Sequence, residues 1–261
     1  QTGADTDADQ SASLSDSVLV YSVANDTGKV GVPVAGDHGG LFTVQSDGSY
    51  QFDPSGAFAS LGAGESVTTA ITYTITDRLG DTDSNGLGAT ASATVSITVT
   101  GVNDAPLDGD ETASTAEDTP LIVSAADGLL KNASDVDTPA ANLKVASFTD
   151  GVTTKNAGET LTIAGKGDLT ILADGSYTFV PAANYHGAVP DVTYTVSDGQ
   201  GGSDSSTLRL TVDPVSDAPE GADQTVTLAE DSLYRFAVAD FGFSDPGDTP
   251  PDNFQAVQIT T

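Results

Sequence analysis

Hydrophobic and polar residues alternate with a period of two along much of this chain. The clearest runs are ITYTIT from Ile71, ATVSITVT from Ala93, VTYTVS from Val192 and TLRLTV from Thr207. Branched or aromatic residues occupy every second position, and threonine or serine fills the positions between them. This pattern predicts half-buried antiparallel strands. Only short runs such as SGAFASL and AADGLLKN have a helical spacing, so we expect an all-β fold.

Two Asp-Gly pairs mark expected hairpin turns. Asp47-Gly48 follows the strand-like run LFTV, and Asp174-Gly175 follows DLTIL. Both residue types tolerate the positive φ of tight turns, so a strand, an Asp-Gly turn and a second strand together predict a hairpin. The alternation also predicts that four tyrosines lie on inner sheet faces: Tyr50, Tyr73, Tyr177 and Tyr194.

The same segments recur at intervals of roughly a hundred residues, a period that indicates a tandem array of domains. The Asp-Gly-Ser-Tyr motif at Asp47 returns after 127 residues, and the Ala-Pro pair at Ala105 returns after 113. With about seven short strands in each repeat, the economical fold is a two-sheet sandwich. We predict tandem Greek-key β-sandwiches arranged end to end.

The offsets between the repeats divide the chain into three predicted domains. Residues 1–104 form a sandwich that lacks its opening strands, residues 105–217 form a complete sandwich, and residues 218–261 begin a third. These uneven ends predict head-to-tail self-association by strand exchange, in which the last part of one molecule completes the first sandwich of another. The abrupt ends also lead us to expect a piece of a longer protein.

The charge of the chain limits its partners. Asp and Glu number 38 against 8 Lys and Arg, for a formal net charge of −30. Such a surface repels nucleic acid and anionic lipid and attracts metal cations. The chain has no cysteine, so it has neither a disulfide nor a thiolate nucleophile, and no apolar run long enough for membrane insertion. Nothing resembles a nucleophile elbow, and we do not expect an enzyme.

Acidic residues gather at each predicted domain boundary. Two carboxylates about 4 Å apart repel by roughly 4 kcal/mol at an effective dielectric constant near 20. A hard divalent cation with six to eight oxygen ligands removes that repulsion, and carboxylates without Cys or regularly spaced His favour calcium over zinc. We therefore predict Ca²⁺ at the boundaries.

Three motifs together resemble a known family. They are the Asp-Ala-Pro joint, the Asp-Gly-Ser-Tyr hairpin and the Ser-Asp-Gly turn, as in VSDGQGGSDSSTLRLTVDPVSDAP. Their order and spacing are similar to those of bacterial cadherin-like and VCBS repeats, which occur in tandem in large calcium-dependent RTX-type adhesins secreted by the type I route. The resemblance implies a cadherin-like sandwich, calcium at the joints and an extracellular or bacterial cell-surface location.

The resemblance and the spacing together nominate ligands for three joints. The first joint would use Asn103, Asp104, Asp135, Asp137 and Asp198. The second would use Glu117, Asp213, Asp217, Asp245 and Asp248. Asp5, Asp7 and Asp77 would form half of a joint at the N-terminal side.

Two functions follow from these features. The first is a calcium-rigidified extender segment of a secreted or surface-anchored bacterial adhesin, which projects a distal ligand-binding domain for attachment and biofilm formation. Its partners would be neighbouring repeats of the same chain. The alternative is a module that itself binds glycan, peptide or a neighbouring cell, for which threonine-rich strands such as residues 72–76 offer a surface. Ordinary β-propensity on a solvated sheet face explains the same threonines without a ligand.

Overall fold

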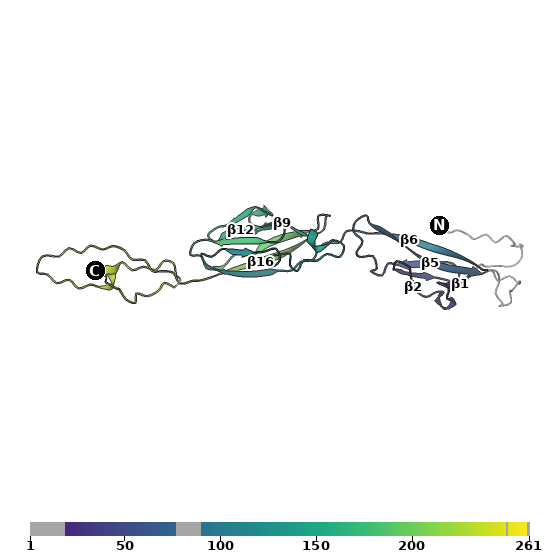
Figure 1. Ribbon diagram of the computed structural model, residues 1–261, viewed down its shortest axis with the longest axis horizontal. Coiled ribbons are helices and arrows are strands. Elements are labelled where there is room, and N and C mark those ends of the chain that lie inside the picture. The colour runs from purple at the N-terminus through teal and green to yellow at the C-terminus, as the bar shows by residue number, and fades with distance from the viewer. Residues whose placement is uncertain (1–18, 77–89, 249, 260–261) are drawn as a thin grey trace. The chain divides into compact units, whose positions relative to one another are not determined.

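The computed structural model describes residues 19–76, 90–248 and 250–259, which fold almost entirely into β-strands (Figure 1). Two compact units result: unit 1 runs to Asp104 and includes Val136–Thr138, and unit 2 holds Ala105–Asp135 and Pro139–Thr261. The predicted separation of residues 218–261 as a third domain stays a prediction. The all-β prediction is confirmed.

The elements of unit 1 are β1 (Leu19–Val23), η1 (Thr27–Lys29), β2 (Val34–Ala35), β3 (Leu41–Val44), β4 (Tyr50–Asp53), β5 (Ser66–Thr76) and β6 (Thr90–Thr100). Those of unit 2 are β7 (Glu111–Ala116), β8 (Leu121–Val123), η2 (Ala140–Asn142), β9 (Lys144–Thr149), β10 (Thr154–Asn156), β11 (Thr160–Ile163), β12 (Gly167–Ile171), β13 (Tyr177–Pro181), β14 (Gly187–Ala188), β15 (Val192–Ser197), β16 (Ser203–Asp213) and η3 (Val238–Phe241). The three η elements are single 3-10 turns.

Unit 2 is a two-sheet sandwich. One sheet has the strand order β10-β9-β15-β16-β14, with β7 parallel to β16, and the other has the order β11-β12-β13-β8 (Figure 1). Alternate side chains of both sheets meet in one core, in which Phe148, Phe179 and Tyr194 are at most 1% exposed. The period-two pattern of the sequence therefore produces the inner faces of the sandwich.

Unit 1 contains two smaller sheets, β1-β5-β6 and β2-β3-β4. The hairpin of β5 and β6 pairs eleven residues of each strand, and it runs along the unit as the longest pair in Figure 1. Phe42, Val23 and Ile71 lie in a core that is smaller than that of unit 2. Unit 1 is thus a reduced sandwich in the part of the chain that the structure describes.

The internal repeat extends to irregular details of the backbone. β1 slips in register against β5 between Val20 and Ser22, and β9 slips at the corresponding place against β15. Both Asp-Gly pairs form the predicted hairpin turns, in which Gly48 and Gly175 have φ of +83° and +82°. In each turn the aspartate Oδ1 accepts the N–H and the hydroxyl of the serine that follows the glycine. The hairpin prediction is confirmed in both units.

The short runs SGAFASL and AADGLLKN form turns, in agreement with the all-β prediction. One expectation from the sequence is wrong. Tyr50 is 51% exposed, whereas its counterpart Tyr177 is 5% exposed. The reason is that β8 covers Tyr177 of β13, and no described strand covers the same side of β4.

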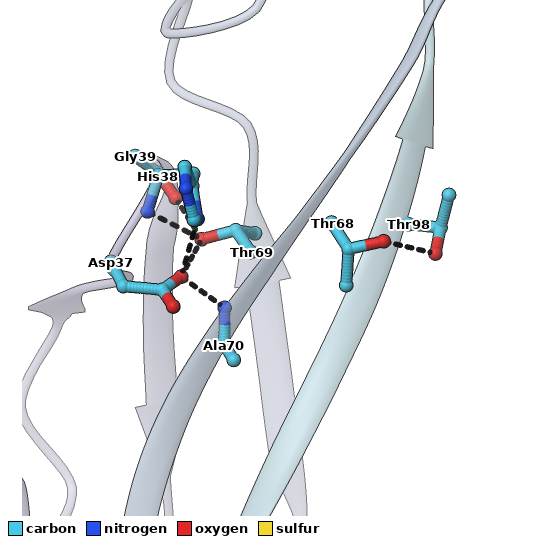
Figure 2. A network of polar contacts seen from close by, with 7 residues as sticks. All are labelled: Asp37, His38, Gly39, Thr68, Thr69, Ala70 and Thr98. Carbon is cyan, nitrogen blue, oxygen red and sulfur yellow. Dashed lines mark hydrogen bonds and ion pairs between the residues drawn. The ribbon is translucent and has the colours of Figure 1, made fainter.

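A polar network ties the two sheets of unit 1 together (Figure 2). The Asp37 carboxylate, in the loop after β2, accepts the Ala70 N–H of β5 at 2.7 Å. This hydrogen bond is the main cause that lowers the pKa of Asp37 below its usual value. The fully buried Thr69 donates its hydroxyl to the Gly39 carbonyl at 2.8 Å and accepts the His38 N–H at 3.3 Å. A buried hydroxyl of β5 therefore holds the loop between β2 and β3 of the other sheet.

We expect Thr69→Val to destabilise unit 1. The substitution keeps the shape of the side chain but leaves the Gly39 carbonyl and the His38 N–H without their buried partner, which costs about 1–3 kcal/mol. Chemical denaturation followed by tyrosine fluorescence measures the loss. Thr68→Val is the matched control, because Thr68 shares an exposed hydroxyl pair with Thr98 and its loss should change stability by less than about 0.5 kcal/mol. Equal effects of the two substitutions would contradict this role of Thr69.

Candidate metal centre

Three carboxylates of unit 2 converge in the loop after the Glu220–Ser244 bridge. Oxygen atoms of Asp245, Asp248 and Asp252 all lie within 4.8 Å of one another. Backbone hydrogen bonds between Glu220 and Ser244, at 2.7 and 2.9 Å, fix the start of this loop. The Asp252 N–H donates to Asp245 Oδ2 at 2.6 Å and folds the loop back on itself. The loop therefore concentrates negative charge.

The segment after β16 contributes to the same cluster. The Asp217 N–H donates to both carboxylate oxygens of Asp248, at 3.3 and 3.2 Å. Gly247 lies so close to Asp217 that a Cβ on this glycine would be 2.7 Å from the Asp217 Cβ. Only glycine allows the loop to approach Asp217 in this way.

Two acidic side chains at this boundary are buried. Asp245 is 5% exposed and Glu117 is 3% exposed. Glu117 follows β7 and accepts the Val215 N–H on Oε1 at 2.6 Å, so it fixes the segment after β16. Three buried oxygens, Asp245 Oδ1, Glu117 Oε2 and Asp217 Oδ2, have no hydrogen-bond partner among the described residues. A buried carboxylate oxygen without a donor is unfavourable, and a bound cation would satisfy it.

The electrostatic environment of Asp248 also indicates uncompensated charge. Desolvation by burial, followed by repulsion from Asp245 and Asp252, raises the pKa of the Asp248 carboxyl above its usual value. The hydrogen bond from the Asp217 N–H opposes this rise. A divalent cation would lower the pKa of Asp248, because it favours the ionised carboxylates.

Of the five ligands predicted for the second joint, Asp217, Asp245 and Asp248 come together. Glu117 is buried, and its Oε2 has no hydrogen-bond partner in the part of the chain that the structure describes. The Asp213 side chain is exposed, and its backbone carbonyl accepts the Glu117 N–H at 2.9 Å. A ligand role for Asp213 stays a prediction.

Within unit 1, the predicted ligands Asp104 and Asp137 are in contact. The Asp104 N–H donates to Asp137 Oδ2 at 3.1 Å, and the Asn103 side chain donates to the Asp104 carbonyl at 2.7 Å. This arrangement repeats that of Asp217 and Asp248. Glu65 lies nearby, because a Cβ on Gly62 would be 3.9 Å from both Glu65 Oε2 and Asp137 Oδ2.

Within unit 2, Asp198 organises the Gly-rich turn between β15 and β16. It is 5% exposed, and its Oδ1 accepts the N–H groups of residues 200, 201 and 202 at 2.7, 3.1 and 3.1 Å. The structure thus gives Asp198 a role in the turn, and its role as a ligand stays a prediction, as does that of Asp135. Asp5, Asp7 and Asp77 lie outside the described residues.

Sequence reasoning missed three acidic residues. Asp252 has no acidic counterpart in the preceding repeat, where the corresponding residue is Ala141, so the comparison of repeats did not select it. Glu65 precedes a strand, far in the sequence from the Asp137 loop. Asp108 is half-buried beside Tyr194, whose hydroxyl donates to its Oδ2 at 2.8 Å, and burial raises the pKa of the Asp108 carboxyl. For Asp108, the signal in the sequence was its position two residues after the Ala105-Pro106 pair of the joint motif.

The candidate ligands at these sites are carboxylate oxygens, and the Asn103 side chain lies beside Asp104. This set suits calcium, which takes six to eight oxygen ligands in a flexible arrangement. The orphaned oxygens of Asp245, Glu117 and Asp217 fit such an ion. Asp248 and Asp252 would complete the acidic set that holds it.

The fold of unit 2 defines a class of β-sandwich domain, and an acidic cluster lies at one of its ends. Residues 103–214 match the family model of the bacterial cadherin-like domain, and this part of the chain is such a domain, as the motifs predicted. Cadherin-like domains are adhesion-type extracellular domains of a non-enzymatic kind, and they generally bind calcium. No described helix has the length and apolarity needed to cross a membrane.

Several solved cadherin ectodomains are similar to the chain. Protocadherin gamma B2 extracellular cadherin domains 1-5 show 15% identity and a TM-score of 0.42, over 83% of this chain and 37% of that one. Drosophila N-cadherin EC1-4 shows 14% identity and a TM-score of 0.31, over 80% of this chain and 44% of that one. This chain therefore spans less than half the length of these structures. A comparison with curated protein sequences finds no match.

Proposed function

We propose that this chain is a calcium-rigidified extender segment of a bacterial adhesin, secreted or anchored at the cell surface. The observation that carries the proposal is the buried acidic boundary of unit 2. Asp245 and Glu117 are almost fully buried, and each keeps an oxygen without a hydrogen-bond partner among the described residues. Asp248 and Asp252 lie beside Asp245, and Asp217 contacts Asp248. The repeated contact between Asp104 and Asp137 supports a similar role at the first boundary.

Calcium acts in this proposal by removing repulsion. Without the ion, Asp245, Asp248 and Asp252 repel one another within 4.8 Å, and the long hydrogen bonds from the Asp217 N–H to the Asp248 carboxylate oppose that repulsion only weakly. With the ion, ligands from the loop, from the segment after β16 and from Glu117 share one charge. The linker then loses its freedom to bend, and the segment projects a distal binding domain for attachment and biofilm formation.

The partners in this proposal are other cadherin-like repeats. Neighbouring repeats of the same chain contact each boundary, and a second copy associates head to tail by exchange of strands. VCBS-type organisation and type I secretion of the parent protein belong to the same proposal, because they accompany repeats of this sequence pattern.

Removal of calcium is expected to change both the shape and the stability of the chain. Small-angle scattering in millimolar calcium should give a larger maximum dimension than scattering after chelation, together with a higher melting temperature by calorimetry on the same samples. Magnesium at the same concentration is the control, because it keeps its waters and a stricter octahedral geometry. Unchanged scattering and melting after chelation would refute the extender function and favour the direct binding of glycan or peptide.

A further inference from the structure

Within unit 2, the segment that leads into β7 is fastened to the sheet by side chains of β15 and β16. The Asp108 N–H donates to Asp204 Oδ2 at 2.8 Å, near the start of β16. The Tyr194 hydroxyl of β15 lies 2.8 Å from Asp108 Oδ2 and 3.0 Å from the Gly109 carbonyl oxygen. Tyr194 itself is fully buried in the core of the sandwich. These contacts fix the chain two residues before β7 begins to pair with β16.

The three oxygen atoms around the tyrosine share one hydrogen atom when Asp108 is ionised. A tyrosine hydroxyl has a single hydrogen to donate, whereas a carboxylate oxygen and a carbonyl oxygen can only accept. Burial, together with the hydrogen bond to Asp108, raises the pKa of Tyr194, so its hydroxyl keeps this hydrogen at neutral pH. Tyr194 therefore satisfies either Asp108 or Gly109 at any moment. One acceptor is always left without its donor.

The other carboxylate oxygen of Asp108 is also poorly compensated. Oδ1 is buried and has no hydrogen-bond partner among the described residues. The nearest basic residue along this segment is engaged elsewhere, because Lys131 pairs with Glu111 at 2.6 Å. A buried carboxylate oxygen without a donor is unfavourable in its ionised form.

The groups that face Asp108 from the neighbouring strands disfavour its negative charge. In the described part of unit 2, the charged groups that act on it are Glu111 of β7 and Asp204 of β16, and both are acidic. Burial is the main cause that raises the pKa of the Asp108 carboxyl, and repulsion from these two acids adds to it. Hydrogen bonds from Tyr194 and from the Gly109 backbone oppose the rise.

We propose that Asp108 is a proton switch that strengthens the attachment of β7 to unit 2 in mild acid. A proton taken up on Asp108 Oδ2 donates to the Tyr194 oxygen, and the Tyr194 hydrogen is then free for the Gly109 carbonyl. The same proton removes a half-buried charge beside Asp204 and Glu111. The switch goes beyond the extender function proposed above and needs no metal ion, because Asp108 is bonded to Tyr194 and Asp204 rather than to the candidate ligands.

The sign of the pH effect follows from the raised pKa of Asp108. In the unfolded chain this carboxyl titrates at its ordinary pKa of about 4, so between that pH and the higher folded pKa the folded state binds more protons. The stability from Asp108 is thus fully present in acid and is lost as the pH rises through its folded pKa. Asp110 behaves in the opposite way, because its hydrogen bond from Arg209 lowers its pKa. Its contribution is present at neutral pH and is lost in acid.

Asp108→Asn in the full chain tests the switch, because the asparagine amide can donate to the Tyr194 oxygen at any pH, as the protonated acid does. The variant should melt higher than the parent at about pH 7, and the difference should disappear at about pH 4. Asp110→Asn is the matched control two residues away. It should melt lower than the parent at neutral pH, and its difference should also disappear in acid. The other carboxylates titrate in all three proteins, so the differences isolate the two substituted residues.

Two measurements on the parent keep the test independent of the folding of the variants. Carbon-13 NMR of labelled aspartate should show that the Asp108 carboxyl titrates above the exposed aspartates. Amide hydrogen exchange, corrected for the intrinsic rate at each pH, should be slower for β7 in mild acid than at neutral pH.

Three results would each overturn the proposal. They are an Asp108 carboxyl that titrates with the exposed aspartates, β7 exchange that does not change with pH, and an Asp108→Asn variant whose melting follows that of Asp110→Asn. Each measurement is made in calcium and in chelator. The switch should act in both conditions, so its failure is distinguishable from a failure of calcium binding.

Discussion

Asp245→Asn combined with Asp248→Asn is expected to abolish the stabilisation of unit 2 by calcium. Both side chains belong to the cluster within 4.8 Å, and Asp245 is buried with one oxygen lacking a hydrogen-bond partner among the described residues. A ligand at a hundred times its dissociation constant stabilises the folded state by about 2.7 kcal/mol. For a unit of this size, that energy corresponds to roughly 5–10 °C in melting temperature, which the double variant should lose.

The double variant is expected to behave differently in chelator. Replacing two carboxylates by amides removes their mutual repulsion and their repulsion with Asp252, so the variant should melt no lower than the parent without calcium. Calorimetric melts in calcium and in chelator, with calcium titration calorimetry, measure both effects. Asp168→Asn with Asp223→Asn is the matched control, because these aspartates are exposed and lie outside the cluster. A variant that retains the calcium-dependent increase would refute the assignment of this cluster.

Glu117→Gln is expected to have opposite effects on the stability of unit 2 in calcium and in chelator. Glu117 is 3% exposed, uses one oxygen for the Val215 N–H and keeps Oε2 without a hydrogen-bond partner among the described residues. Glutamine keeps an acceptor for Val215 and removes a buried charge, so the variant should be at least as stable as the parent in chelator. In calcium it should be less stable than the parent, because an amide oxygen is a weaker ligand than a carboxylate oxygen.

A change in the order of melting temperatures between calcium and chelator would show that Glu117 is a metal ligand. A carboxylate that only accepts the Val215 N–H would not produce it. If Glu117 served only to hold Val215, glutamine would have the same effect in calcium and in chelator. Glu117→Ala provides the comparison, since it removes the acceptor and should destabilise unit 2 in both conditions by about 1–3 kcal/mol. Parallel changes for glutamine in both conditions would remove Glu117 from the metal site.

The site was partly predictable because it repeats. Asp217, Asp245 and Asp248 were identified from the recurrence of acidic residues at matching positions, and the structure brings them together. Asp252 and Glu65 have no acidic counterparts at the matching positions of the other repeats, so only the folding of the loops reveals that they lie near the predicted ligands. Burial of Glu117 and Asp245 also depends on tertiary contacts that no single segment encodes.

The sequence by itself determined the strands, the Asp-Gly hairpins and the repeat, because a period of two and positive-φ turns are local properties of the chain. The tertiary structure decided which strand edges are closed. Tyr50 and Tyr177 occupy the same position of the same motif, yet only Tyr177 is buried, since β8 covers β13 and no described strand covers β4. Burial depends on what packs against a residue, so the same local pattern gives a buried tyrosine in unit 2 and a half-exposed one in unit 1.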